Sequence, residues 1–439
     1  MFSIHLALLL LVIFVGIRYG GIAFGLLGGL GVSIMGIAFD VPAGTPPISV
    51  MLIILAVVAA SATLEVTGGL ALLVKLAEKL LRKNPDRIVF MAPITAWGLT
   101  ALAGTGHSVY PLLPVAYDVA YSKGIRPERV MPTTTIASQM GITASPLSAA
   151  IAVMVTASFD NSWGIGLGSV LMVTIPATFL GVIAASLVSL KRGKDLANDP
   201  DFQERLKDPE FKEQLISEAM STEQTDEEKK VAKRGLTIFL GGIATLVIIA
   251  LFGMNLLPKG TSLGTVIQML MLSVGAIILI SCNVNTKRIV RSNVFIAGMS
   301  ALVTIFGIAW LSDTIISHHK LAIIDMMGDM VSAMPWLFAL ALAIASAFIK
   351  SQAACLTALL PLGISLGIEP AVLIGVLPSI YAYWFWPFYP SDLAAIEFDR
   401  TGTTRIGRFV LNHSFMLVGA TGVTVATICG YFISTMIVN

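Results

Sequence analysis

The sequence predicts an all-α, multi-pass membrane protein in which two inverted repeats carry re-entrant helical hairpins and broken transmembrane helices. The chain of 439 residues is 56% hydrophobic and 12% charged, whereas a soluble domain usually carries about 25% charged residues. Apolar runs near the length of about 20 residues that crosses a bilayer recur along the whole chain. Matching motifs and matching interruptions of these runs occur in both halves of the chain.

The first repeat is predicted to cover residues 1–190. Two short apolar runs within 88–122 are separated by a polar break, and basic residues flank both outer ends. Cationic loops stay cytoplasmic, so these runs fit a re-entrant hairpin that enters from the cytoplasm, although two full spans would satisfy the same flanks. Residues 130–157 are predicted to form a broken helix, because Ser145 followed by Pro146 can cap and restart a helix.

The second repeat is predicted to cover residues 235–439, after a charged cytoplasmic linker at 191–234. The linker alternates acids and bases, a pattern typical of a solvated, partly helical segment. A second re-entrant hairpin is expected at about 335–366. A second broken helix is expected at 371–399, because prolines interrupt that run.

An offset of 243 residues relates the two halves. It carries Gly124–Pro127 onto Gly367–Pro370, and it places the break at His107 onto the break at Lys350. The first half begins outside and the second begins inside, so the repeats are inverted in the membrane. Inverted repeats with discontinuous helices place the substrate site of many secondary transporters near the bilayer midplane.

The basic residues also set the expected topology. Of the 28 lysines and arginines, only Lys259 and Lys320 fall outside, and Lys350 falls within the membrane. Both termini are then periplasmic. Residues 312–334 are expected to form an outer loop in which His318 and His319 are solvated rather than metal-binding.

The four helix interruptions are predicted to form a substrate site. A helix N-terminus carries unpaired N–H groups and about half a positive charge, so converging N-termini can bind an anion without arginine. Two symmetric sets of donors suit a ligand with two anionic ends, such as a dicarboxylate, although phosphate, arsenite or a monocarboxylate would also fit. The predicted substrate-binding residues are Thr105, Gly106, His107, Ser108, Ser145, Ser351, Gln352 and Ser391.

Lys350 and Asp392 are opposite charges that we place near the bilayer midplane, where an ionisable group is a functional candidate. They could set the charge balance or couple transport to an ion, or they could form a salt bridge that only locks the fold. The intramembrane side chains of His107, Gln139 and Gln352 could likewise be interhelical hydrogen bonders, and the serines could be packing residues. The aromatic cluster of Tyr381, Tyr383, Trp384, Trp386 and Tyr389 could shape the wall of a cavity.

Three single cysteines without metal-site or disulfide spacing give no reason to expect a metal or a cofactor. An intramembrane enzyme is disfavoured, because neither a His-Glu-x-x-His nor a Gly-x-Ser-x-Gly motif occurs. An anion channel remains an alternative. No nucleic-acid partner is expected.

Several longer motifs are spread over nearly the whole chain. They are Tyr19-Gly20-Gly21-Ile22-Ala23, Gly104-Thr105-Gly106-His107, Ile125-Arg126-Pro127-Glu128-Arg129, Gln139-Met140-Gly141-Ile142, Ser351-Gln352-Ala353-Ala354, Tyr389-Pro390-Ser391-Asp392 and Asn412-His413-Ser414-Phe415. In these motifs the sequence strongly resembles the Dcu family of bacterial anaerobic C4-dicarboxylate transporters.

The resemblance implies a carrier of the cell inner membrane that exchanges fumarate, succinate, malate and aspartate. It also implies a homodimer surrounded by membrane lipid, and a membrane sensor kinase is a possible partner. Transport of another divalent anion, or sodium- or proton-coupled symport of dicarboxylates, remains an alternative reading.

Overall fold

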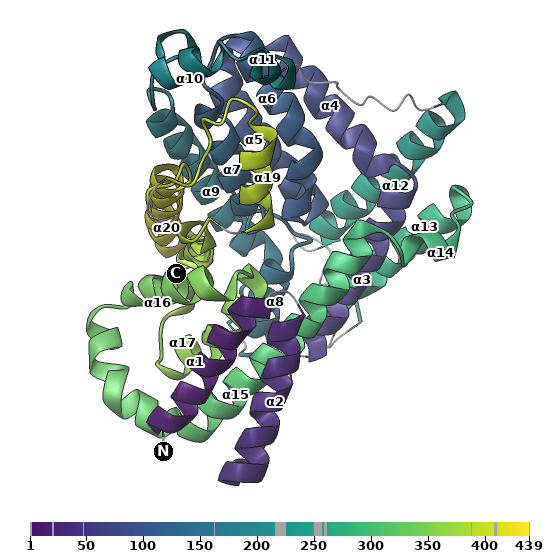
Figure 1. Cartoon of the computed structure of the whole chain (residues 1–439). Helices are drawn as coiled ribbons and strands as arrows, with labels where there is room; N and C mark the ends of the chain where they lie inside the picture. Colours follow the sequence, from purple (N-terminus) through teal and green to yellow (C-terminus); the bar gives the residue numbers. More distant parts are fainter. Residues whose placement is uncertain are drawn as a thin grey trace.

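The structure is a computed structural model that describes residues 2–19, 22–46, 48–161, 163–215, 225–249, 257–258, 261–387, 389–407 and 411–438. Within these ranges the chain is almost entirely helical and contains no named strand (Figure 1). The all-α prediction is therefore confirmed, whereas the inverted relation of the two halves stays a prediction. Lys259 and residues 216–224 of the predicted linker lie outside the described ranges.

The described residues of the first half form nine α-helices. They are α1 (Phe2–Tyr19), α2 (Ala23–Phe39), α3 (Ile48–Val66), α4 (Gly69–Lys83), α5 (Ile88–Ala103), α6 (Leu113–Ser122), α7 (Met131–Gly141), α8 (Ala149–Asp160) and α9 (Leu167–Ser189). Short 3-10 helices precede three of these helices: η1 (Pro85–Arg87) before α5, η2 (Gly106–Leu112) before α6 and η3 (Pro127–Arg129) before α7.

The remainder of the chain begins with η4 (Leu196–Asn198) and two short helices, α10 (Pro200–Arg205) and α11 (Pro209–Leu215). The elements that follow are α12 (Asp226–Ile248), α13 (Leu263–Ser281), α14 (Thr286–Ile289), α15 (Asn293–Ala333), α16 (Leu337–Ile349), α17 (Gln352–Ser365), α18 (Pro370–Gly375), η7 (Leu377–Ile380), η8 (Tyr383–Phe385), α19 (Pro390–Phe398) and α20 (Met416–Ile437).

Five described helices are long and apolar enough to cross a membrane, namely α9, α12, α13, α15 as far as His319, and α20. A sixth span arises if α3 and α4, which are bent by 70° at their junction, are counted together. The apolar helices α16 and α17 have 13 and 14 residues, a length expected of re-entrant segments rather than of full spans.

Two predicted boundaries differ from the structure. α12 begins at Asp226, so the boundary placed at 234/235 falls inside a helix; a capping box between Thr225 and Glu228 starts this helix earlier. Residues 312–334, predicted as an outer loop, continue α15 to Ala333. The predicted topology placed these residues in an outer loop, but no proline interrupts the chain before Pro335, so the helix persists.

Helices α2 and α15 cross at very short distance through glycine. A Cβ added to Gly307 would lie 1.7 Å from the backbone oxygen of Gly25, and a Cβ added to Gly28 would lie 2.3 Å from the backbone carbon of Gly307. A helical Gly29, one residue further along, would have no heavy atom within 4 Å of an added Cβ. Backbone contact therefore requires glycine on one side of α2.

We expect Gly307→Ala to destabilise the protein by about 1–3 kcal/mol or more, because the backbones must separate to admit the methyl group. Gly29→Ala is the matched control and should be neutral or stabilising, since alanine favours a helix by about 1 kcal/mol over glycine. Thermal unfolding of both purified variants measures the difference. Equal melting temperatures would contradict the close crossing.

A buried ionic network ties the first half of the chain to the following segment and to the stretch before α20. Arg126 pairs with Glu128 at 2.7 Å and also with Asp199, while Arg192 approaches Glu128 at 3.2 Å. The Ser414 hydroxyl donates to Glu128 at 2.8 Å. Partial burial raises the pKa of Asp199, but hydrogen bonds from Arg126 and the backbone outweigh burial and hold this pKa below its usual range.

Glu128→Gln should cost about 3–5 kcal/mol, because it removes the partner charge of Arg192 and leaves Arg126 paired with Asp199 alone. The exposed pair of Glu204 and Lys207, 2.6 Å apart, provides the control. Glu204→Gln should cost less than about 1 kcal/mol. Denaturation in detergent compares the two; a loss of similar size in both variants would disprove the special role of the buried network.

Candidate functional site

The helices are interrupted at all four predicted places. α5 stops at Ala103 and η2 follows from Gly106, whereas α7 stops at Gly141 and α8 starts at Ala149. In the second half, α16 stops at Ile349 and α17 starts at Gln352. α18 stops at Gly375, and α19 starts at Pro390 after two 3-10 turns. Continuous helices at these positions are thus ruled out.

The tip of the first hairpin packs into the break between α7 and α8. Gly104 has a left-handed φ of 75°, and a Cβ there would lie 2.8 Å from the Cβ of Leu147. A Cβ on Gly106 would lie 2.4 Å from Nε2 of Gln139. Glycine is therefore required at Gly104 by its conformation and by the close approach of the broken helix, whereas a side chain at position 106 would displace the amide of Gln139.

Side chains of this tip mainly hold its own conformation. The hydroxyl of Thr105 accepts a hydrogen bond from the His107 N–H at 3.3 Å. Ser108 is buried, and its hydroxyl lies 2.9 Å from that of Thr100. The His107 ring is exposed and stacks on Tyr110, with 5.8 Å between ring centroids. Of these side chains, His107 is the one most open to a ligand.

The tip of the second hairpin is built similarly. Lys350 ends α16 in the left-handed region with φ 54°. Ser351 then caps α17, its hydroxyl accepting from the Ala354 N–H at 3.3 Å. The hydroxyl of Ser346 accepts from the Ala382 N–H at 2.9 Å, so this tip packs against the second broken segment.

A hydrogen-bonded network joins the two halves inside the protein. Nε2 of Gln352 donates to the backbone oxygen of Gln139 at 2.8 Å and to the Tyr383 hydroxyl at 3.3 Å. The Tyr383 hydroxyl donates to Oε1 of Gln139 at 2.7 Å. All three residues are at least 97% buried. This network joins α7, the second tip and the second broken segment into one polar centre.

The sequence singled out Gln139 and Gln352 as intramembrane amides and Tyr383 as a member of a cavity wall, but it did not predict that these three side chains meet. The available signal was an amide side chain within an apolar run. It did not show that Gln139 contacts Gln352 and Tyr383 of the second half. Tyr110 was missed, and Tyr389 was predicted only as part of the cavity wall. The contact between η2 and α19 brings them together.

Asp392 and Ser391 lie in the first turn of α19 and are 1% and 0% exposed. The Ser391 hydroxyl and both carboxylate oxygens of Asp392 have no hydrogen-bond partner among the described residues. Lys350 lies near enough to act electrostatically on Asp392. Buried polar groups without partners cost free energy, so this turn is poised to receive a ligand, an ion or a proton.

The expected restart of the first broken helix at Ser145 and Pro146 is wrong by about one turn. Ser145 accepts from the Leu147 N–H at 3.2 Å within a series of turns, whereas Ser148 accepts from the Ile151 N–H at 3.2 Å and caps α8. The turn hydrogen bond from the Ser148 N–H to the Ser145 oxygen, at 3.2 Å, delays the helix. Ser145 is fully buried inside the break.

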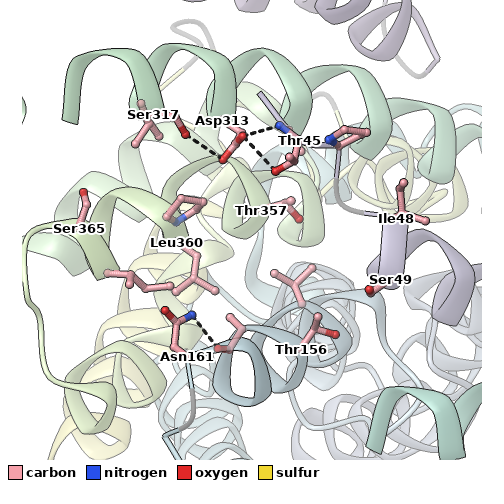
Figure 2. A pocket seen from close by; sticks show the side chains of 17 residues that line it. Thr45, Ile48, Ser49, Thr156, Asn161, Asp313, Ser317, Thr357, Leu360 and Ser365 are labelled. Atoms are coloured by element: carbon pink, nitrogen blue, oxygen red, sulfur yellow. Dashed lines mark hydrogen bonds between the residues drawn. The ribbon is translucent and has the colours of Figure 1, made fainter. Parts of the chain in front are cut away.

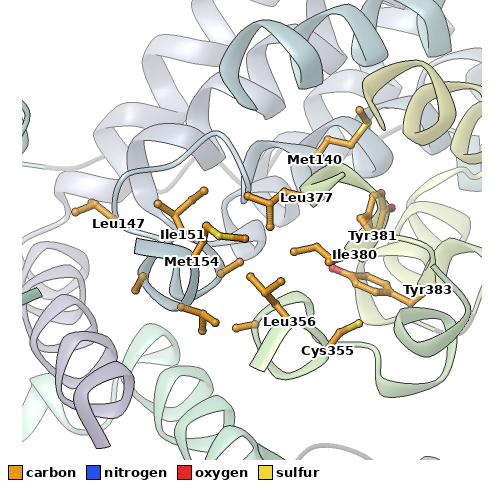
Figure 3. Close-up of a cluster of buried hydrophobic side chains, with 14 of the residues drawn as sticks. Met140, Leu147, Ile151, Met154, Cys355, Leu356, Leu377, Ile380, Tyr381 and Tyr383 are labelled. Carbon is orange, nitrogen blue, oxygen red and sulfur yellow. The ribbon is translucent and has the colours of Figure 1, made fainter. Parts of the chain in front are cut away.

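An apolar cluster adjoins the polar centre and shares Tyr383 with it (Figure 3). It joins side chains from both broken segments and from α17, so that the interruptions of the two halves share one core. The labelled members are Met140, Leu147, Ile151, Met154, Cys355, Leu356, Leu377, Ile380, Tyr381 and Tyr383. The four interruptions therefore form one assembled region.

A cavity of about 480 Å³ lies elsewhere, between α8, α15, α17 and the segment before α3 (Figure 2). Its polar lining includes Asn161, Asp313 and Ser317. Asp313 accepts from the Thr45 N–H at 2.7 Å. The cavity borders the C-terminal parts of α8 and α17, whereas the interruptions lie at their N-terminal ends, so the predicted substrate residues do not line it.

The sequence model of a family described as anaerobic C4-dicarboxylate membrane transporters, DcuA/DcuB, matches residues 1–438. The anaerobic C4-dicarboxylate transporter DcuB of Escherichia coli O6:H1 is 44% identical over 99% of both chains. The C4-dicarboxylate transporter DcuA of E. coli K12 is 39% identical over 99% of both chains, and that of Wolinella succinogenes is 36% identical over the full length of both.

Two solved structures share the fold at low sequence identity. The YdaH transporter of Alcanivorax borkumensis superposes with a TM-score of 0.59 at 14% identity, covering 98% of each chain. MtrF of Neisseria gonorrhoeae, from a class of antimetabolite efflux pumps, superposes with a TM-score of 0.58 at 15% identity, covering 92% of this chain and 84% of that one. The family match, the transporter relatives and the candidate spans of the described helices confirm the prediction of a multi-pass membrane protein.

Proposed function

This chain belongs to the DcuA/DcuB family of anaerobic C4-dicarboxylate membrane transporters, and on that premise we propose that it exchanges C4-dicarboxylates across the inner membrane by alternating access. Membership makes it a transporter rather than an enzyme. The proposed substrates are fumarate, succinate, malate and aspartate. In the proposed topology both termini are periplasmic.

The observation that supports this proposal is that the helix interruptions of both halves meet inside the protein. One carboxylate of the substrate would bind near the first-half residues Thr105, His107 and Ser145, and the other near Ser351 and Ser391. The N-termini of α17 and α19 offer N–H groups and partial positive charge to an anion. The unpartnered hydroxyl of Ser391 adds a buried donor at the same place.

Counterflow in proteoliposomes tests this function. Vesicles loaded with unlabelled succinate should take up labelled fumarate far faster than empty vesicles, because exchange needs a substrate on both sides. Butyrate has the same carbon count but one carboxylate, so it should compete poorly. Equal uptake into loaded and empty vesicles would exclude obligatory exchange and favour a channel or a symporter.

A second candidate function is proton-coupled symport, and the state of Asp392 favours it. Its carboxylate is buried and without a hydrogen-bond partner among the described residues, as expected of an intramembrane group that carries a proton. Uptake into empty vesicles driven by an imposed pH gradient would support symport. Uptake that ignores the gradient and requires internal substrate would support exchange.

A further inference from the structure

Three of the five histidines in the chain come together where α1, α2 and α15 meet, a place that the transport mechanism does not use. These three helices lie side by side near the N-terminus in Figure 1. His5 comes from α1, and His318 and His319 come from α15. One potential ligand atom from each residue lies within 4.8 Å of the other two.

Two of the three histidine side chains are buried. His5 is 2% exposed and His319 is 9% exposed, while His318 is open. The His5 ring packs edge-on against Phe39 at the end of α2, with 4.8 Å between centroids. Although neighbouring residues on a helix normally diverge, the rings of His318 and His319 are perpendicular with centroids 4.7 Å apart.

The nitrogen atoms are nearly spaced for a metal ion. Nδ1 of His5 lies 2.7 Å from Nε2 of His319, whereas ligand nitrogens in a tetrahedral zinc site lie about 3.3 Å apart at Zn–N distances of about 2.0–2.1 Å. The 2.7 Å contact needs a proton on only one of the two nitrogens, and a metal ion could replace that proton. Small side-chain rotations would move these two nitrogens apart to the spacing of about 3.3 Å in a tetrahedral zinc site.

The other ring nitrogen of His5, Nε2, is buried and has no hydrogen-bond partner among the described residues. Neutral imidazole is the form that binds metal. A buried nitrogen without a partner costs free energy in the empty cluster.

We propose that His5, His318 and His319 bind one divalent transition-metal ion, of the class that prefers imidazole, such as Zn²⁺. Three histidines leave the fourth position of a tetrahedral site open to water. The ion would link the first helix of the chain to α15 of the second half. The site is independent of the four helix interruptions, so its fate and that of the transport proposal are separable.

Titration of the purified full-length protein with Zn²⁺ in detergent tests the proposal. We expect one saturable equivalent per chain, and His5→Gln or His319→Gln should weaken the affinity by at least about tenfold, since even indirect partners of metal ligands contribute that much. The matched control replaces the other two histidines, as His107→Gln with His413→Gln, and should bind as tightly as the original chain. Co²⁺ should give the intense visible absorption of a tetrahedral site.

Two results would overturn the proposal: no saturable Zn²⁺ binding to the original chain, or unchanged affinity in the variants of the cluster. If a buried-site variant does not fold, His318→Asn serves instead, because His318 is exposed. Mg²⁺ should not compete, since it prefers oxygen ligands. Competition by Mg²⁺ at similar concentration would count against an imidazole site.

Discussion

Replacing Gln352 by leucine is expected to lower the rate of dicarboxylate exchange by at least about tenfold, and up to a thousandfold, while the protein still reaches the membrane. Leucine nearly fills the same volume but donates no hydrogen bond. The Gln139 backbone oxygen and the Tyr383 hydroxyl then each lose a buried partner, at about 1–3 kcal/mol apiece. That loss loosens the contact between the two halves on which the site depends.

Initial rates of counterflow in proteoliposomes measure this effect. Gln268→Leu on α13 is the matched control, because Gln268 is only half-buried and lies outside the network; it should exchange at the original rate. Tyr383→Phe should give a smaller loss. The double variant with Gln352→Leu should be less impaired than the sum of the two losses, because both remove parts of one network. Additive losses would contradict a shared network.

Opposite changes in apparent affinity are expected when the charges of Lys350 and Asp392 are removed singly. Asp392→Asn takes a negative charge from a site that binds a dianion, so KM should fall while substrate release and turnover slow. Lys350→Asn should raise KM, because the remaining carboxylate repels the substrate. In a buried environment each change should be about tenfold or more. Asparagine also tolerates the left-handed conformation at residue 350.

Combining Lys350→Asn with Asp392→Asn should restore part of the exchange rate, because the charge balance returns. Concentration dependence of counterflow gives KM and maximal rate for the three variants. If Lys350 and Asp392 form only a structural salt bridge, both single variants should unfold at a lower temperature and KM should stay unchanged. Movement of KM in the same direction in both single variants would also contradict the charge-balance role.

The sequence predicts the helix interruptions well because their causes are local. Proline and serine capping act within a few residues of the position they affect, so the breaks near Pro390 and Ser351 can be found without a partner. The same locality misplaces details: Ser148 caps α8 instead of Ser145, because both residues are good caps and the turn between them decides. The capping preference of serine alone does not predict which of the two residues caps α8.

Features set by partners far along the chain escape such reasoning. Gln139 meets Gln352 and Tyr383 across the two halves, and nothing in its own neighbourhood indicates this. His5 lies 314 residues from His319 in the chain and yet contacts it. The predicted outer loop at 312–334 is helical as far as Ala333, because α15 continues through it. The offset of 243 residues pointed to paired breaks, but it did not give their contacts.

Protection of single cysteines by substrate tests most directly whether both halves hold one dianion. In a chain whose three cysteines are replaced, Thr105→Cys and Ser351→Cys place one thiol in each tip, at positions that are partly exposed. Succinate should slow labelling of both thiols over the same concentration range, and butyrate should protect them much less. Protection of one tip only, or of neither, would contradict a site shared between the two halves.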